Sequence, residues 1–389
     1  MTNIELNIVY GNHINPNHLT DLAEIAYSAF KNSRAIESIT FSKHPIKERL
    51  NLIIEEFSDA DFCEKLILLK RDYPKTKFIL IITEIPTDFS YNTFNKYDNL
   101  ISKHIYNSLL NNIDIKSIRT FLRAIYLEYL KKFHPFFKTK SIFFDYKNVK
   151  GNLTLKVLNK LYKVIFKKSS PYFFKFLYYR SDLIYFVIRF INTKKLISLN
   201  LFDKIYIINE SSRKIIDLAF QCESKEFPYY IQPKAVGDKT EVFMFSGNLT
   251  QERVEIIKKI EAHGFQVGLN PDFNDLGRRI LYERSMFSIQ ISRYLNGNFS
   301  SPTRTINALA HGVIPIPLTM PLYSTMEQDL SLPILSDALK MLSESNIEDR
   351  NNIMGKLYVN HMHKIFDAVE SINKRSYEII NADLFDIYR

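Results

Sequence analysis

One arginine stands in a segment whose residue types could bind phosphate. Residues 301–316 have the sequence SPTRTINALAHGVIPI, which predicts a capped turn, a short helix, a glycine stop and a buried strand. Ser301 or Thr303 can cap the helix, a proline suits its first turn, and Gly312 suits the position just after its end. Arg304 would then lie in the first helical turn. Because helix N-termini attract anions and a guanidinium offers a planar fork of donors, we interpret the segment as a candidate site for a nucleotide diphosphate.

A second turn of this kind follows the apolar strand predicted at residues 241–245. Gly247 lets the backbone approach a ligand closely, and Thr250 can cap the next helix. We therefore expect Gly247 and Asn248 to contact the same phosphates. Arg293, just after another predicted strand, is either aimed at phosphate or is a solvated strand end.

Arg304, the alanine four residues on, the glycine eight residues on and the following VIPI together resemble a family motif. The segment is similar to the "R…A…G-C-I-P-V" segment of exostosin-like and CgeB-like glycosyltransferases. The resemblance covers roughly the last 150 residues. It implies the two-domain GT-B fold, with Ser301, Thr303, Arg304 and Gly247 binding the phosphates of a nucleotide-sugar donor.

Two further features follow from comparison with this fold. In GT-B enzymes a carboxylate after the last donor-domain strand often binds ribose or sugar hydroxyls, and Glu327 is the residue expected to do so here. The large retaining GT-B family also carries two glutamates spaced eight apart. Those places fall near Phe299 and Asn307 in this chain, so the glutamates are missing, which counts against a retaining mechanism.

An inverting transferase needs a general base close to the acceptor hydroxyl. Such a base should follow a strand of the first domain, where Glu84 and Asp88 follow one strand and His13 follows another. Glu84 is the first choice, because it comes directly after a buried strand, with Asp88 and His13 as substitutes. We expect no metal ligands, because arginines and helix N-termini hold the leaving diphosphate in this fold.

Positive charge is concentrated in residues 131–195, which hold sixteen lysines and arginines against two aspartates, within a chain whose net charge is +10. Many phenylalanines and tyrosines are interleaved with them. Lysines with aromatics suit an anionic membrane surface, and they also suit nucleic acid. The remaining interpretation is a helical region with an aromatic core and solvated lysines. We favour the membrane surface, because no nucleic-acid motif accompanies the segment, and regard nucleic acid as an unlikely partner.

Strand and helix patterns alternate along the chain, which predicts an α/β protein with parallel sheets. The fold class expected is two Rossmann-like domains facing a cleft, with the basic aromatic segment as a helical insertion in the first. The predicted units are an acceptor domain at 1–225, a linker at 226–240 and a nucleotide-sugar domain at 241–389. In the first domain the patterns predict strands at 5–10, 38–41, 77–82 and 203–208. They predict helices at 19–30, 46–57, 62–71, 97–110, 115–130 and 213–220.

Length and composition suit this organisation. A chain of 389 residues is long enough for two domains, and its two cysteines have no metal or disulfide spacing. Neither a signal peptide nor a membrane-spanning stretch is apparent. The sequence therefore predicts a cytoplasmic glycosyltransferase, peripheral at the inner face of the cell membrane, that needs no cofactor. It would move a sugar from a nucleotide donor to a glycan or lipid-linked acceptor in surface polysaccharide synthesis. The alternatives are a nucleic-acid-binding α/β protein and an inactive GT-B-like scaffold.

Overall fold

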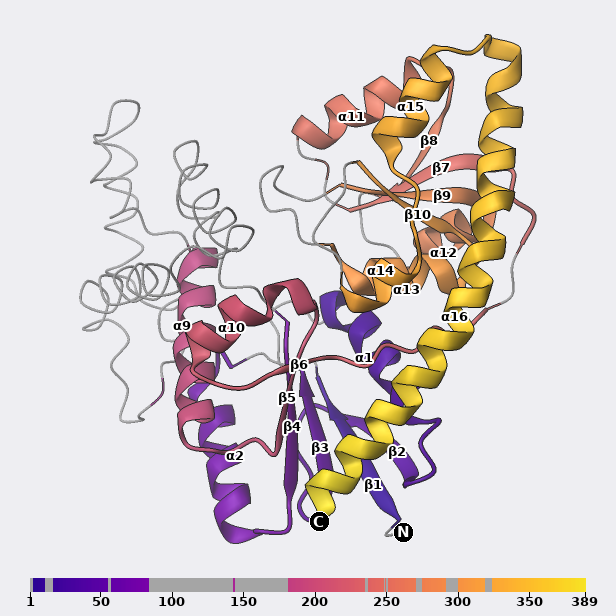
Figure 1. Cartoon of the computed structure of the whole chain (residues 1–389). Helices are drawn as coiled ribbons and strands as arrows, with labels where there is room; N and C mark the ends of the chain where they lie inside the picture. The colour runs from indigo at the N-terminus through magenta and orange to yellow at the C-terminus, as the bar shows by residue number, and fades with distance from the viewer. Residues whose placement is uncertain are drawn as a thin grey trace, which may run out of the picture.

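The computed structural model contains two parallel α/β sheets, consistent with two Rossmann-like domains (Figure 1). It describes residues 3–10, 17–54, 57–83, 143, 181–234, 237–247, 249, 251–270, 275–291, 300–318 and 324–389. The expected α/β class with parallel sheets is confirmed. The helices expected at 97–110 and 115–130 and most of the basic segment lie outside the described residues.

Six strands form the first sheet, in the order β2-β1-β3-β4-β5-β6, and every neighbouring pair is parallel. The strands are β1 (Ile4–Val9), β2 (Ile36–Ser42), β3 (Leu50–Ile54), β4 (Lys77–Ile82), β5 (Lys204–Ile207) and β6 (Lys225–Glu226). The helices of this part are α1 (Asn17–Phe30), α2 (Ala60–Asp72), α9 (Ser181–Ser198), η1 (Glu210–Ser212) and α10 (Arg213–Phe220).

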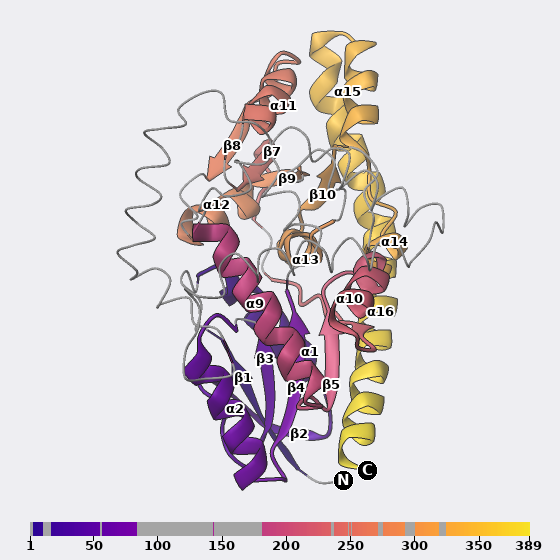
Figure 2. The same cartoon turned by 90° about the vertical axis from the view of Figure 1, so that its left-hand side faces the viewer.

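Both faces of this sheet are covered, which explains the unbroken apolar run of β4. Ile79 and Ile81 belong to a core shared with α1, whereas Phe78, Leu80 and Ile82 pack with α2, α9 and α10. A strand buried on both faces has no polar side to alternate with. Figure 2 shows α2 and α9 side by side in front of the strands.

The helix expected at residues 46–57 is wrong, because these residues contain β3, which is buried along its whole length. Leu52 lies between Ile8 of β1 and Ile79 of β4. The apolar residues suit a helical period and a buried strand equally well, and pairing with two distant strands decides between them.

Four strands form the second sheet, in the order β10-β9-β7-β8, again with all pairs parallel. They are β7 (Glu241–Ser246), β8 (Val267–Asn270), β9 (Ser285–Gln290) and β10 (Ile314–Pro317). The helices are α11 (Gln251–Glu261), α12 (Asp275–Arg284), α13 (Pro302–Ala310), α14 (Thr325–Asp329) and α15 (Leu335–Ser343).

Both sheets share one strand order, in which the first strand lies between the second and the third. The direction of the connections therefore reverses beside the first strand, between β1 and β3 and again between β7 and β9. In open parallel sheets, ligands bind at the carboxyl ends of the strands at this reversal. The loops after β7 and β9 are the ones that carry Gly247 and the turn before α13.

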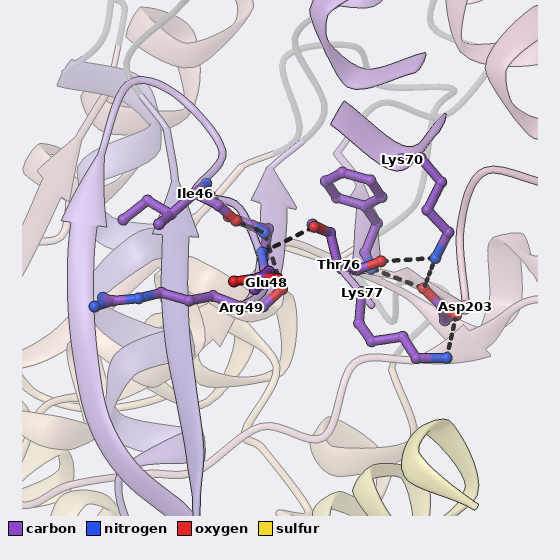
Figure 3. A network of polar contacts seen from close by, with 9 residues as sticks. Ile46, Glu48, Arg49, Lys70, Thr76, Lys77 and Asp203 are labelled. Atoms are coloured by element: carbon purple, nitrogen blue, oxygen red, sulfur yellow. Dashed lines mark hydrogen bonds and ion pairs between the residues drawn. The ribbon is translucent and has the colours of Figure 1, made fainter. Parts of the chain in front are cut away.

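The opposite, amino edge of the first sheet is closed by a polar network (Figure 3). Asp203 accepts hydrogen bonds from the backbone amide of Phe78 and from the ammonium groups of Lys70 and Lys77, at 2.8 to 3.2 Å. The hydroxyl of Thr76 accepts from the amide of Glu48. These contacts fasten the starts of the strands together, so this edge has a structural role.

One helix, α16 (Arg350–Tyr388), is 39 residues long and runs beside both sheets (Figures 1 and 2). It begins after η2 (Ile347–Asp349), packs on α14, α15 and β10, and then contacts α1. The Asn373 side chain bonds the backbone N–H and C=O of Ile231, and Asp383 reaches Lys204 of the first sheet. The C-terminal helix therefore crosses from the second sheet back to the first.

Candidate anion site between the two sheets

Helix α13 begins and ends where the sequence predicts. Ser301 occupies the N-cap position with extended backbone, and its carbonyl accepts from the amides of Arg304 and Thr305. Its hydroxyl caps no amide and lies 3.2 Å from the hydroxyl of Thr303. Gly312 follows the helix with φ of 64°, a left-handed conformation that suits glycine.

Arg304 lies in the first turn of α13 with a half-buried side chain. Within the part of the chain that the structure describes, its guanidinium has no hydrogen bond or ion pair. Burial lowers the pKa of Arg304; Tyr282 and Asp21 act against this, and the like charge of Arg278 adds to it. A charged, half-buried group without a partner is costly, and an anion would offset that cost.

An ion pair between the two sheets lies beside Arg304. The guanidinium of Arg278, on α12, donates to both oxygens of Asp21, on α1, at 2.6 and 2.8 Å. Their side chains are 24% and 23% exposed. Tyr282 is buried nearby, and burial raises the pKa of its hydroxyl to about 12, so it stays neutral at physiological pH. Neither member of the pair could be singled out from the sequence, because each resembles an ordinary surface charge on a helix.

Gly247 directly follows β7, at a place with little room for a side chain. A Cβ atom there would lie 3.2 Å from the ring of Phe245 and 3.5 Å from the guanidinium of Arg253. Arg253 is buried over that ring and donates to the carbonyl of Ile291, at the end of β9, at 2.8 Å. It therefore joins the ends of the two strands that flank the reversal of strand order. Sequence reasoning missed it, although it is the third residue of its helix, as Arg304 is.

Glu327 is buried at the start of α14 and is held from several sides. Its carboxylate accepts from the hydroxyl of Thr305 at 2.5 Å, from the hydroxyl and amide of Ser324 at 2.8 and 3.1 Å, and from the hydroxyl of Ser300. Burial raises its pKa, and these hydrogen bonds act against the shift. A sugar or ribose hydroxyl bound to Glu327 would take the place of one of these donors.

Residues of the first sheet extend the hydrogen-bond network around Glu327. The side-chain amide of Asn209, after β5, donates to the Ser300 hydroxyl at 3.0 Å. The carboxylate of Glu226, on β6, accepts from the amides of Thr325 and Glu210. Contacts between the two halves therefore meet around the starts of α13 and α14, close to the expected phosphate-binding residues.

The structure brings Ser301, Thr303 and Arg304 together at one helix start, with Glu327 bound to the same helix through Thr305. The other predicted site residues, Glu84, Asp88, His13, Asn248 and Arg293, lie outside the described residues.

Of the basic aromatic segment, Phe143 and residues 181–195 are described. Phe190 is buried against Phe220, and Arg189 is buried and donates to the Thr83 hydroxyl at 3.1 Å. These two side chains therefore belong to the interior, whereas the expected membrane surface falls mostly outside the described residues.

The described residues contain neither a candidate membrane span nor a candidate metal cluster. No helix among them is long and apolar enough to cross a membrane. No group of three or more histidine, cysteine, aspartate or glutamate side chains among them could hold a metal ion. No known family model and no curated protein matches the chain.

Proposed function

We propose that the chain is a GT-B glycosyltransferase that binds the diphosphate of a nucleotide sugar at the start of α13. It transfers the sugar to a glycan or lipid-linked acceptor in surface polysaccharide synthesis. The fold-level support is the pair of parallel α/β sheets with the same strand order.

The observation that carries the proposal is the state of Arg304. It is positively charged, half-buried and without a hydrogen-bond partner among the described residues, and it lies in the first turn of a helix of nine residues. The backbone dipole and the guanidinium both favour negative charge at that place. A diphosphate supplies the charge and the paired oxygens that an arginine binds best.

The position of the site in the sheet supports the same ligand. Gly247 follows β7 and the turn before α13 follows β9, and these strands flank the reversal of strand order where ligands of such sheets bind. The close approach of Phe245 and Arg253 leaves little room for a side chain at Gly247.

In the proposed reaction, a base of the first domain removes the proton of an acceptor hydroxyl, and the oxygen attacks the sugar carbon that carries the diphosphate. Glu84 remains the proposed base, with Asp88 and His13 as substitutes. Charge then develops on the leaving diphosphate, and Arg304 stabilises it, as preorganised donors do for a developing anion. Turnover is expected to persist after chelation of divalent metals.

The proposal is tested by the melting temperature of the protein with UDP, GDP, CMP and their common sugar conjugates. A ligand that binds the folded state raises this temperature by mass action. We expect one nucleotide class to raise the melting temperature. Arg304→Ala should lower the affinity for that nucleotide by about 10- to 100-fold, since a hydrogen bond to a charged group contributes about 1.5 to 3 kcal/mol.

Arg279→Ala is the matched control, because Arg279 is an arginine of the same half whose side chain is 71% exposed. It should leave the nucleotide affinity within about twofold, an effect well below 1 kcal/mol. Absence of a shift with every nucleotide would refute the proposal and direct attention to salt-dependent nucleic-acid and liposome binding. Nucleotide binding without turnover would indicate an inactive scaffold.

A further inference from the structure

Helix α13 is held at its carboxyl end by donors from outside the helix. The carbonyl groups of residues 310, 311 and 312 accept, in that order, from the amide of Lys234, the ammonium group of Lys239 and the hydroxyl of Tyr358, at 2.6, 2.9 and 2.7 Å. Carbonyl groups at a helix end lack partners within the helix, so donors of this kind fix its position.

Lys239 is the donor that joins two helix ends. Its ammonium group also donates to the carbonyl of Tyr282, in the last turn of α12, at 2.9 Å. The rings of Tyr282 and His311 are stacked, with centroids 5.1 Å apart and planes 11° apart. Burial lowers the pKa of Lys239 to about 8, and Glu283 acts against this, so most of the group is charged at pH 7. Positive charge is favourable at the carboxyl end of a helix, and here one charge lies at two such ends.

Two of the donors to α13 belong to the connecting segment (residues 227–240), which joins β6 of the first sheet to β7 of the second. This segment is also bound to other helices. Asn373 of α16 bonds the backbone N–H and C=O of Ile231, and Lys31 of α1 donates to the side chain of Gln232 at 2.6 Å. The carboxyl end of α13 is therefore attached to the segment that joins the two halves.

The amino end of α13 carries the candidate anion site. The Ser301 hydroxyl caps no amide there, and the Arg304 guanidinium has no hydrogen bond or ion pair in the described part of the chain. A helix of nine residues is about 13 Å long and moves as one piece, so a shift of its carboxyl end also shifts Arg304 and the amides of the first turn. Hydrogen bonds to an anion weaken steeply when their distances and angles change.

We propose that Lys239 is a positioning residue of this anion site. It fixes the carboxyl end of α13 to α12 and to the connecting segment, and thereby holds Arg304 and the first-turn amides where a diphosphate binds. Because coupling between two places is reciprocal, a diphosphate bound at α13 also restrains the connecting segment. This inference rests on the proposed function for the identity of the natural ligand, but the positioning itself requires only a diphosphate group.

The test measures the affinity of inorganic pyrophosphate, and of any nucleotide that stabilises the wild type, by titration calorimetry at pH 7. Lys239→Met keeps the length of the side chain but removes its charge and its donors, so it should lower the affinity by about three- to tenfold. Lys239→Arg keeps a positive donor group, and its affinity should lie closer to that of the wild type. Tyr358→Phe removes another donor from the same helix end and should lower the affinity in the same direction.

Lys234→Met is the matched control, because it makes the same change in the same segment at an exposed side chain and retains the Lys234 amide that reaches α13. It should change the affinity by less than about twofold. A melting temperature measured without ligand shows whether each variant remains folded. A residue that only stabilised the fold would lower this temperature and leave the affinity of the folded protein unchanged. That result for both Lys239→Met and Tyr358→Phe would overturn the inference.

Hydrogen exchange measures the reciprocal effect. The amide of Lys234 is bonded to the end of α13, so saturating pyrophosphate should slow its exchange in the wild type, and should slow it less in Lys239→Met. An exchange rate that pyrophosphate leaves unchanged in the wild type would contradict the coupling between the site and the connecting segment.

The outcomes separate this inference from the proposed function. Nucleotide binding that depends on Arg304 but is unchanged in Lys239→Met and Tyr358→Phe would support the transferase and refute the inference. Pyrophosphate binding that weakens in Lys239→Met, with no response to any nucleotide, would support the inference and refute the transferase. No binding of pyrophosphate or nucleotide to the wild type would refute both.

Discussion

Two buried carboxylates, Asp383 and Glu327, both connect distant parts of the chain, but their surroundings differ. Asp383, on α16, contacts the ammonium groups of Lys204 and Lys225 at 2.5 and 3.0 Å and the hydroxyl of Tyr206 at 2.7 Å. Glu327, at the start of α14, is bound by hydroxyl groups and a backbone amide, with no cation among these donors.

The pKa values of the two groups move in opposite directions. Burial alone would raise the pKa of Asp383, but hydrogen bonds from Lys204, Tyr206 and Lys225 and the charge of Lys204 leave it lowered. Burial raises the pKa of Glu327, and its neutral donors offset only part of that shift. Cations stabilise a buried carboxylate more than neutral donors of similar number do.

This difference indicates two roles: Asp383 is a clamp, an ion-paired anchor between α16 and the first sheet, whereas the hydrogen bonds to Glu327 can be exchanged. Asp383 holds the end of α16 on the first sheet by opposite charge. Figure 1 shows the C-terminal end of α16 at the bottom of the molecule, away from α13. Glu327 lies at that site, where serine and threonine hydroxyls can rotate toward a ligand. Rigid anchoring at one end and exchangeable hydrogen bonds at the other suit a protein whose ligand binds between its two sheets.

The largest effect is expected from removing the clamp. Asp383→Ala leaves the Lys204 ammonium group, whose side chain is 15% exposed, without its carboxylate, and it leaves the buried Tyr206 hydroxyl without its acceptor. It should therefore lower the free energy of unfolding by about 3 to 5 kcal/mol. Urea unfolding measures this loss. Lys225→Ala is the control, because Lys225 is 52% exposed and its removal should cost about 0 to 1 kcal/mol. Equal losses in both variants would contradict the clamp.

Asp383 and Glu327 should also affect the pH dependence of the free energy of unfolding in different ways. Asp383 has a lowered pKa, so its ionised form stabilises the folded protein at any pH above 3.8, the ordinary pKa of the group. This contribution to stability is lost as the pH falls below 3.8. Glu327 has a raised pKa, so its buried charge costs stability above that pKa, and the cost disappears as the pH falls toward 4.5.

Urea unfolding of Asp383→Asn and Glu327→Gln between pH 3 and 7.5 compares these slopes. The advantage of the wild type over Asp383→Asn should shrink only below about pH 4. The wild type should gain stability relative to Glu327→Gln as the pH falls from neutral toward 4.5. Parallel pH profiles for the two variants would show that the surroundings of the carboxylates do not differ as described.

The smallest effect concerns two buried tyrosines. Tyr206 donates to the Asp383 carboxylate, whereas Tyr229 donates to the carbonyl of Ile208 at 2.6 Å. A hydrogen bond to a charged acceptor is stronger, so Tyr206→Phe should cost about 1.5 to 2 kcal/mol and Tyr229→Phe about 1 kcal/mol. Thermal unfolding measures the loss of stability in each variant. A larger loss for Tyr229→Phe than for Tyr206→Phe would contradict the charged state of Asp383.

Elements with a local pattern could be predicted from the sequence. The apolar run predicted β4 correctly, and the proline and arginine of α13 with the glycine that follows it predicted this helix correctly. Strand burial and helix ends are both reflected in the types of neighbouring residues. Residues 46–57 carry no such mark. Their apolar spacing fits two structures, and β3 is a strand because β1 and β4 lie on either side of it.

Some residues of the candidate site could likewise be predicted from the sequence, and others could not. Arg304 and Gly247 could be chosen from the sequence, because each stands beside a turn or helix start with a recognisable composition, whereas Glu327 was expected only from the resemblance to the GT-B fold. Arg278 and Asp21 could not, because their meaning depends on a partner 257 residues away. Arg253 does have a local signal in the sequence, because it lies in the first turn of a helix that follows a glycine loop.

By itself, the sequence determined the alternation of strands and helices, the two parallel sheets and the place of the arginine at the start of α13. The tertiary structure alone decided that β3 is a strand, that Arg278 is paired while Arg304 has no hydrogen bond or ion pair among the described residues, and that Asp383 and Glu327 have opposite pKa shifts. The physical reason is that backbone conformation responds to near neighbours. Burial and charge pairing depend instead on groups that folding brings together from far along the chain, such as Tyr206 and Asp383, 177 residues apart.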